Sequence, residues 1–320
     1  MLRAEKFGGL PRKLRVQYPD AIYHVMNRGD RREDIFLDDP DRLQFLDTLG
    51  EACEKTDWVV QAYCLMRNHF HLVVETPRAN LAVGMQWLLG TYTARFNRRH
   101  RCSGHLFSGR YKALIVDGSA NGYLKAVGDY VHLNPVRAKL LPMGERLDRY
   151  RWSSYPFYLK AASWRPKWLR VERLLGEWGI GQDNAAGRGR FKRAMERRKQ
   201  QEQSLAHEDW KSLRRGWCWG PTTFREELLE LVAEQRGEHH VGDELWESAE
   251  QKAQRLLEQM LARAGWTDDD LRKHRKGDPA KVQLAARMRT ETTMSWKWIA
   301  EKLRMGHWRS AANAVRSAGK

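Results

Sequence analysis

The sequence predicts an α+β fold, a ferredoxin-like antiparallel sheet with helices, followed by a C-terminal α-helical extension. Two observations predict it. From about Tyr18 to Leu141, strand-like runs take turns with segments whose apolar residues recur at helical spacing. The last hundred residues show helical spacing alone. The order strand–helix–strand–strand–helix–strand–helix is that of a split βαβ unit with helices on one face of the sheet.

The expected strands have distinct local signals. Ala21–Arg28 reads as the first strand, and a polar, charged turn follows it. Trp58–Met66 and His69–Thr76 are rich in Val and aromatic residues, and only Arg67-Asn68 separates them, which favours an antiparallel hairpin. A fourth strand is expected at Ala113–Val116, after a basic segment punctuated by glycines.

Three helices are expected between these strands and after them. The first runs from Asp39 to about Lys55, where leucines recur at helical spacing and Asp39 or Asp41 can cap it. The second runs from Asn80 to about Arg98 and ends in a basic run. The third runs from about Ala120 to His132, with Ser119 as its cap.

The chain of 320 residues is expected to divide into three parts, 1–160, 161–225 and 226–320. The middle part reads as a basic, Trp-rich linker with helices, and Gly187–Lys199 is its densest basic patch. In the last part, two apolar-periodic helices flank a turn around Gly306. That pattern is typical of a helix-turn-helix with Ala311 to Arg316 in the recognition helix, although any small helical hairpin can produce it.

Charge is the strongest global signal. Lysine and arginine number 57 against 40 acidic residues, which gives a net charge of +17 and a pI near 9.9. A polyanion such as nucleic acid explains this excess, because neutralised phosphates release counterions. No apolar run or leader suggests a membrane span or secretion, and the four cysteines form no C-x-x-C pair. We therefore expect a cytoplasmic, nucleoid-associated protein with free thiols.

A pair of histidines stands in the third expected strand. Alternate side chains of a strand share one face, so His69 and His71 point the same way while Phe70 points into the core. Two imidazoles on a rigid sheet make plausible metal ligands. An isolated H-x-H is also common by chance, and such histidines are often satisfied polar groups.

Tyr130 and Asn134 lie four residues apart near the end of the third expected helix, so they share one face of it. A tyrosine hydroxyl can attack phosphorus and form a covalent phosphotyrosine. A divalent cation on the scissile phosphate would assist it, and Asn134 could complete a metal site with His69 and His71. The alternative is that Tyr130 packs in the core and Asn134 ends the helix ahead of Pro135.

Four motifs together resemble a known family. PRKLRVQYPDAIYHVMNRGDRREDIF, LMRNHFHLVVET, GHLFSGRYKALIVD and YVHLNPVRAKL occur in the order and spacing typical of REP-associated tyrosine transposases, relatives of the single-tyrosine HUH transposases. The resemblance covers about residues 11 to 160. Each motif is weak alone, and the set is specific.

The resemblance implies a function and a site. His69 and His71 match the paired histidines that hold Mg²⁺ or Mn²⁺, and Asn134 matches the polar residue that completes that site. Tyr130 matches the nucleophile that leaves a 5′-phosphotyrosine and a free 3′-hydroxyl. The implied substrate is single-stranded DNA beside a palindromic hairpin repeat, and homodimers occur among relatives. No motif position is missing.

Basic residues near these motifs are expected as a set to follow DNA phosphates, and Phe107, Tyr111 or Trp152 could stack unpaired bases. Each one separately could equally be a plain surface charge or a core aromatic residue. The expected phosphate contacts are Arg28, Arg31, Arg32, Arg110, Lys112 and Arg137.

Two other functions fit the same sequence. One is a sequence-specific DNA-binding regulator without cleavage, and the other is an RNA-binding module, because ferredoxin-like sheets often present aromatic residues to RNA.

Overall fold

The computed structural model describes residues 16–119, 121–142, 144–202, 216–237 and 243–318. It confirms the α+β class and the expected order of the first seven elements. One sheet holds the five strands in the order β2-β3-β1-β4-β5. Its strands are β1 (Ala21–Arg28), β2 (Val59–Met66), β3 (His69–Thr76), β4 (Lys112–Val116) and β5 (Cys218–Trp219). The first four pair antiparallel, as expected, whereas β5 runs parallel to β4, so the sheet is mixed.

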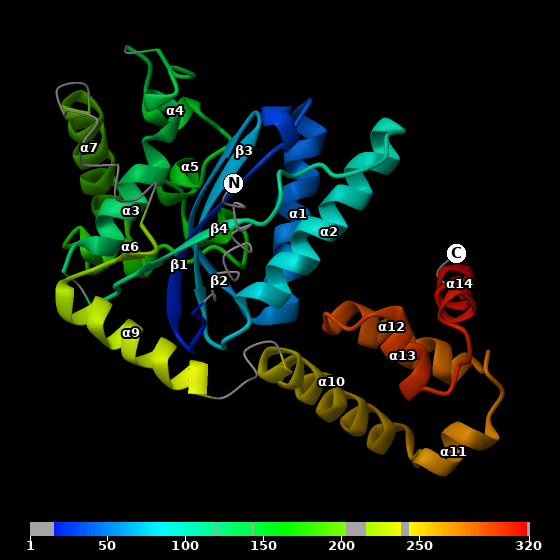
Figure 1. The fold of residues 1–320 in the computed structure, drawn as a ribbon. Helices are drawn as coiled ribbons and strands as arrows, with labels where there is room; N and C mark the ends of the chain where they lie inside the picture. The colour runs from blue at the N-terminus through cyan, green and yellow to red at the C-terminus, as the bar shows by residue number, and fades with distance from the viewer. Residues whose placement is uncertain (1–15, 120, 143, 203–215, 238–242, 319–320) are drawn as a thin grey trace, which may run out of the picture.

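Helices cover both faces of the sheet, which corrects the expectation of helices on one face. Helices α1 (Asp39–Thr56) and α2 (Leu81–His100) lie together on one face, where Phe45 of α1 contacts Phe70 of β3. Helix α3 (Tyr123–His132) lies on the other face, where Tyr130 contacts His71 (Figure 1). Phe70 and His71 are neighbours in a strand, so their side chains point to opposite faces.

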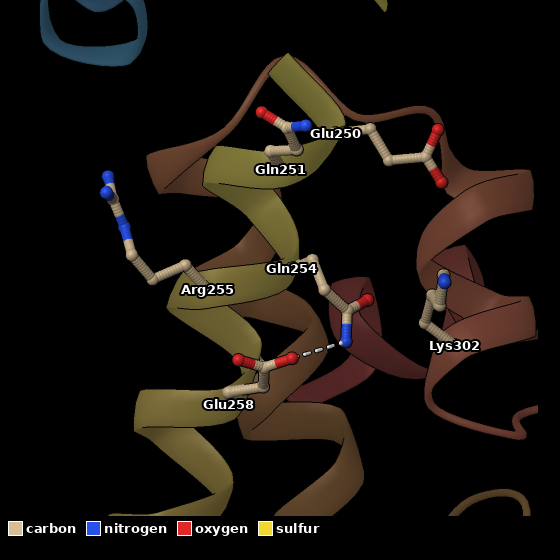
Figure 2. A pocket seen from close by; sticks show the side chains of 6 residues that line it. All are labelled: Glu250, Gln251, Gln254, Arg255, Glu258 and Lys302. Atoms are coloured by element: carbon tan, nitrogen blue, oxygen red, sulfur yellow. Dashed lines mark hydrogen bonds between the residues drawn. The ribbon is translucent and has the colours of Figure 1, made fainter. Parts of the chain in front are cut away.

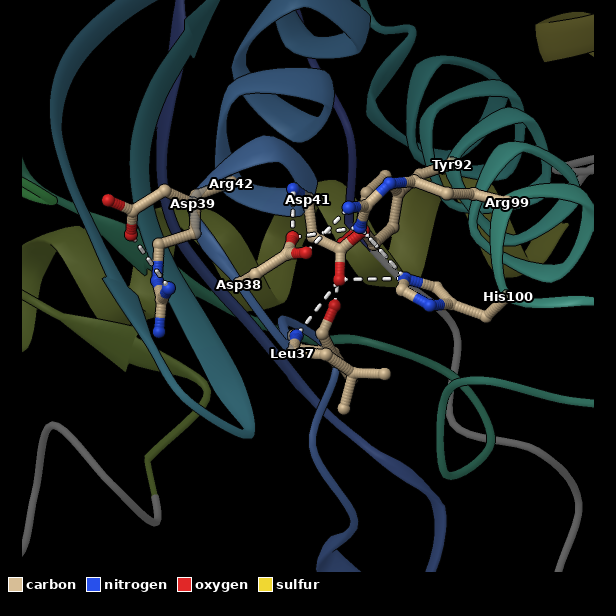
Figure 3. Close-up of polar contacts among 9 residues, drawn as sticks. Leu37, Asp38, Asp39, Asp41, Arg42, Tyr92, Arg99 and His100 are labelled. Carbon is tan, nitrogen blue, oxygen red and sulfur yellow. Dashed lines mark hydrogen bonds and ion pairs between the residues drawn. The ribbon is translucent and has the colours of Figure 1, made fainter.

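The cap of α1 is Asp38, not Asp39 or Asp41. The Asp38 side chain accepts a hydrogen bond from the amide of Asp41 at 3.0 Å. The Asp41 carboxylate is fully buried and accepts from Arg99 and His100 at the end of α2 (Figure 3). Part of the basic run that ends α2 therefore joins the two helices.

Helix α3 begins later than its sequence predicts. It starts at Tyr123 after Gly122, whose positive φ of 81° suits glycine, and Ser119 hydrogen-bonds Asp117 instead of capping the helix. The expected start at Ala120 lies outside the described residues. After His132 a short helix, α4 (Asn134–Arg137), continues the chain.

The core of the sheet does not end near residue 160. Its buried cluster runs from Val16 to Leu228 and includes Phe191 of α7. Residues on both sides of position 160 therefore contribute to one buried cluster. Within the described residues, the α-helices between positions 150 and 237 are α5 (Tyr155–Tyr158), α6 (Glu172–Glu177), α7 (Ala185–Gln201) and α9 (Thr222–Gly237).

A second cluster of buried residues forms at the C-terminal end, between Ala253 and Ala311. Its helices are α10 (Asp243–Ala264), α11 (Asp268–Lys273), α12 (Pro279–Glu291), α13 (Trp296–Lys302) and α14 (Trp308–Ala318). Lys55 of α1 donates hydrogen bonds to the carbonyls of Arg289 and Thr290, so this bundle docks against the α1–α2 face. Across the described residues, we find no helix with the length and apolarity that a membrane crossing requires.

Candidate active site

The pairing of the strands gathers the expected site residues on one face of the sheet. Arg28 lies directly opposite His69, and Met26 lies opposite both His71 and Lys112. Residues that face each other across antiparallel strands share a side of the sheet. Arg28, His69, His71 and Lys112 therefore stand on the face that α3 covers. The expectation that the two histidines point the same way holds in this register.

His71 is fixed by a third histidine that sequence reasoning missed. Nε2 of His24, on the neighbouring β1, lies 3.0 Å from Nδ1 of His71, and the two rings stack with centroids 5.2 Å apart. Both side chains are 2% exposed. When Nδ1–H of His71 donates to His24, the lone pair on Nε2 of His71 is left for a ligand.

His69 is held in the same way by its sequence neighbour. Its Nδ1 lies 2.7 Å from Oδ1 of Asn68, and the amide nitrogen of Asn68 donates to the carbonyl of Arg32 at 3.0 Å. The amide nitrogen is thereby engaged as a donor, so Oδ1 accepts the Nδ1–H of His69. Nε2 of His69 then also keeps its lone pair. A hydrogen bond from the ring nitrogen that does not bind the metal is what orients a metal-binding imidazole.

Burial keeps all three rings neutral. Desolvation lowers the pKa of His24 and of His69 to about 4 each. Burial, followed by the neighbouring His24, holds the pKa of His71 well below its usual range. An imidazole must be unprotonated to bind a metal ion, so both members of the pair are available at neutral pH and below it.

Tyr130 reaches the same face from α3. Its ring centroid lies 5.5 Å from those of both His71 and His24, edge to face, and its side chain is only 4% exposed. The Arg137 guanidinium lies 4.5 Å from the centroid of the phenol ring and donates to the Tyr130 carbonyl at 2.7 Å. The phenol is thus in a packed setting, bordered by imidazoles and one cation.

Arg137 has a second partner. Its Nε donates to the carboxylate of Glu202, which follows α7, and its side chain is 7% exposed. This largely buried ion pair differs from the exposed phosphate contact expected of Arg137. The Arg137 guanidinium lies next to Tyr130, so a phosphate that reached the phenol would also contact this guanidinium.

Asn134 lies where α3 gives way to α4, so it is not on one continuous helix with Tyr130. It is 7% exposed, and its Nδ2 atom is buried without a hydrogen-bond partner among the described residues. A buried amide nitrogen without a hydrogen-bond partner is the kind of group with which a ligand or a water molecule forms a hydrogen bond. Because rotation of the amide by a half turn exchanges its oxygen and nitrogen, either atom of Asn134 can occupy this position.

The residues present fit a divalent cation in part. His69 and His71, with centroids 5.1 Å apart, offer two neutral nitrogens whose other ring nitrogens are engaged. Within the described ranges, no group of three or more His, Cys, Asp or Glu side chains has an arrangement that could hold a metal ion. Further ligands would therefore have to be of another kind, such as an amide oxygen or phosphate oxygens, which Mg²⁺ and Mn²⁺ accept.

The other expected DNA-contacting residues divide by exposure. Arg28, Arg31, Arg32, Arg110 and Lys112 are all exposed. Arg31 and Arg32 have left-handed backbones, with φ of 49° and 66°, in the turn after β1. Phe107, Tyr111 and Trp152 are each less than 10% exposed and belong to the core. This burial favours the interpretation of the three aromatic residues as core residues over their stacking on bases.

His24, Asn68 and Glu202 are the site residues that sequence reasoning missed. His24 belongs to a strand that was expected, and its alternation placed it on one face. Its partner His71 is 47 residues away, so only the strand order and register bring the two together. Asn68 was interpreted only as a turn residue, and Glu202 directly follows α7, a helix whose packing the sequence did not reveal.

Comparisons with known proteins give one family model and one solved structure that resemble part of this chain. A family model described as "Transposase IS200 like" matches residues 17–134, the segment that holds His24, His69, His71, Tyr130 and Asn134. A solved structure described as a REP-associated tyrosine transposase bound to a REP hairpin is 10% identical, with a TM-score of 0.39. The alignment covers 50% of this chain and 91% of that one, a likeness too distant to assign an activity. Among curated proteins, none matches this chain.

Proposed function

We propose that residues 17–134, which match the family model of IS200-like transposases, form a single-strand DNA endonuclease and strand transferase that uses Tyr130 as its nucleophile. The observation that carries the proposal is one arrangement of side chains. A phenol from α3 lies edge-on to His71, one of two β3 imidazoles whose Nδ1 atoms are both engaged. The exposed cations Arg28 and Lys112 lie on the same face of the sheet.

The proposed reaction is a transesterification. The Tyr130 oxygen forms a bond to the scissile phosphorus as it loses its proton to water, and the bond from phosphorus to the 3′-oxygen breaks. The 3′-oxygen takes up a proton and leaves as a hydroxyl, while the 5′-phosphate stays on Tyr130. One phosphodiester bond replaces another, so no external energy source is needed, and the reverse attack by a 3′-hydroxyl reseals a strand.

The residues around Tyr130 have defined tasks in this scheme. Arg137 packs on the phenol ring and places a positive charge beside the incoming phosphate. His24 and Asn68 fix the rings of His71 and His69. These two histidines, with Asn134, would hold Mg²⁺ or Mn²⁺, which when bound polarises the phosphate and orients it. The exposed cations Arg28, Arg31, Arg32, Arg110 and Lys112 would follow the strand's phosphates.

The substrate is proposed from the motif resemblance and from charge. The motifs that resemble REP-associated transposases imply a strand beside a DNA hairpin, and a net charge of +17 favours a polyanion. A regulator that binds without cleaving would not need a phenol beside a pair of oriented imidazoles. The geometry therefore favours cleavage over binding alone.

The test is cleavage of a DNA hairpin oligonucleotide with single-stranded flanks by the full chain in Mn²⁺. We expect Tyr130→Phe to lose cleavage and the covalent protein–DNA adduct while it binds the hairpin within about threefold of the parent. Tyr123→Phe, on the same helix but packed against Trp219, is the matched control and should cleave normally. Cleavage and adduct that persist in Tyr130→Phe would refute the assignment.

A further inference from the structure

Helices α13 and α14 are joined by a tight, well-formed reversal. The amide of Met305 donates to the carbonyl of Ala300 at 2.8 Å, and the amide of Arg304 donates to that of Glu301 at 3.1 Å. Arg304 has a left-handed φ of 54°. This pair of bonds is a Schellman motif, which ends a helix and turns the chain sharply. Gly306, with φ of 78°, then leads into α14.

The reversal is supported from inside by a small core. Ala311 of α14, Ile299 of α13 and Met288 of α12 are at most 1% exposed and belong to one buried cluster. Helix α14 contacts both α12 and α13. The three helices therefore form a compact unit of the helix-turn-helix type, with α14 in the position of the recognition helix.

On its other side α13 faces α10. Trp298 of α13 donates its indole N–H to Glu250 of α10 at 2.6 Å, and Lys302 of α13 faces α10 across a cavity of about 350 Å³ (Figure 2). Helix α13 therefore packs on α12 and α14, and the Trp298–Glu250 hydrogen bond links it to α10. Helix α14 packs on α12 and α13 through its apolar side, and Arg309, Asn313 and Arg316 on its polar side are exposed.

The exposed side of α14 has a distinctive composition. Arg309, Asn313 and Arg316 follow at spacings of four and three residues, so they form one stripe, and all three are exposed. Nη1 of Arg316 lies 3.4 Å from Oδ1 of Asn313. The helix contains no carboxylate. Arginine and asparagine are the side chains that pair bidentately with guanine and adenine in the major groove.

We propose that the α13–α14 unit is a second nucleic-acid site, which binds double-stranded DNA with α14 in the major groove. Charge complementarity supports this occupant, because residues 292–318 carry Lys297, Lys302, Arg304, Arg309 and Arg316 against Glu301 alone. The groove of B-DNA is about 12 Å wide and admits a helix, whereas the major groove of A-form RNA is too narrow for side chains to read.

This site is separate from Tyr130. The bundle docks on the α1–α2 face through Lys55, whereas Tyr130 lies on the α3 face. The sheet stands between the two, so a duplex on α14 and a single strand at Tyr130 are distinct segments of DNA. The inference does not rest on the proposed cleavage chemistry, and duplex binding can be measured in a chain that does not cleave.

The experiment is selection from a pool of random 30-base-pair duplexes by the full chain carrying Tyr130→Phe. We expect a short motif to be enriched, and Asn313→Ala/Arg316→Ala to bind the selected duplex roughly 10- to 100-fold more weakly, in keeping with the loss of bidentate base contacts. The matched control is Arg263→Ala/Lys273→Ala, which removes two exposed cations from α10 and α11 and should keep the parent affinity.

The substituted positions are exposed, so thermal unfolding should match that of the parent chain. Three outcomes would overturn the proposal. They are the absence of any enriched motif, equal binding of the selected duplex by the parent and Asn313→Ala/Arg316→Ala, and tighter binding of a duplex RNA of the same sequence. Failure of Tyr130→Phe to stop hairpin cleavage would count against the proposed function and leave this inference standing.

Discussion

At the scale of single residues, the site depends on where the second nitrogen of each imidazole is placed. His71 and His69 are ordinary members of an alternating strand, and any H-x-H in a strand shares one face. What distinguishes this pair is that His24 and Asn68 engage the two Nδ1 atoms. Those contacts orient both Nε2 atoms, and burial keeps the rings neutral.

Replacement of His24 tests this orientation. His24→Leu removes the acceptor for Nδ1–H of His71 but keeps the buried volume roughly similar, so we expect the Mn²⁺ concentration needed for half-maximal cleavage to rise about 10- to 100-fold. His24→Gln offers an amide oxygen near the same place and should recover much of the loss. Titration of cleavage with Mn²⁺ measures both. Equal metal dependence in all three chains would contradict the role.

Asp129, the neighbour of Tyr130 in α3, gives a pH prediction. Burial raises the pKa of Asp129 to about 7, although Arg198 lies 3.4 Å away. The folded state therefore binds more protons than the unfolded state between about pH 4 and 7. The associated stability is fully present below pH 4 and is lost as pH rises through about 7.

Asp129→Asn should remove this loss. Between pH 5 and pH 8 the parent should lose roughly 1–3 kcal/mol of unfolding free energy that the variant keeps. Urea unfolding of both chains at the two pH values measures the difference. If the unfolding free energies of the two chains differ by the same amount at pH 5 and at pH 8, the Asp129 carboxyl does not titrate in this range.

At the scale of elements, α2 owes its position to a close approach at one glycine. A Cβ on Gly84 would overlap the ring of Trp58, whose indole N–H donates to Asn80 at 2.9 Å. Gly90, on the same helix, is exposed and has open space around its Cα. Gly84→Ala should therefore destabilise the protein by about 1–3 kcal/mol, and Gly90→Ala should stabilise it by about 0.5–1 kcal/mol.

Thermal or urea unfolding of the two variants makes this comparison, because both introduce the same methyl group into the same helix. Stabilisation of equal size at both positions would show that helix propensity, not packing on Trp58, decides the result.

The elements differ in how far the sequence could predict them. The strands Ala21–Arg28 and His69–Thr76 match their predicted bounds because each is a short run, rich in apolar residues, that borders a polar turn. The start of α3 was misplaced because Gly122, a glycine with positive φ, ends the preceding loop in place of a side-chain cap. Strand β5 has only two residues and exists through its pairing with β4, so it leaves no local signal.

The candidate site shows the same division. The candidate residues His69, His71 and Tyr130 could be predicted, because their spacing within one strand or helix and their motifs are visible in the sequence. The contact between His24 and His71 depends on strand order, and the pairing of Arg137 with Glu202 depends on where α7 packs. Such contacts join residues 47 and 65 positions apart, a distance over which periodicity carries no information.

At the scale of the whole molecule, the positively charged side chains fall into two groups. Some form ion pairs within the fold, as in Arg99–Asp38 and Arg165–Asp183, while others remain exposed near the candidate site. If Arg28, Arg31, Arg32, Arg110 and Lys112 each neutralise one phosphate, the slope of log affinity against log salt should be about −3.5 to −4.5 for the DNA hairpin.

Arg31→Ala/Arg32→Ala should flatten that slope by about 1.4 to 1.8, and the control Arg263→Ala/Lys273→Ala should leave it unchanged. Fluorescence anisotropy of the labelled hairpin between 50 and about 300 mM salt provides the measurement. An unchanged slope in Arg31→Ala/Arg32→Ala would place these two arginines away from the DNA.

The measurement that tests the central claim most directly is the site of the covalent bond. The full chain is incubated with a DNA hairpin carrying single-stranded flanks, with and without Mn²⁺, and digested for tandem mass spectrometry. The account predicts a 5′-phosphonucleotide on Tyr130, formed only with the cation and absent from His69→Ala/His71→Ala. An adduct on another residue, or one that forms equally in the histidine variant, would contradict it.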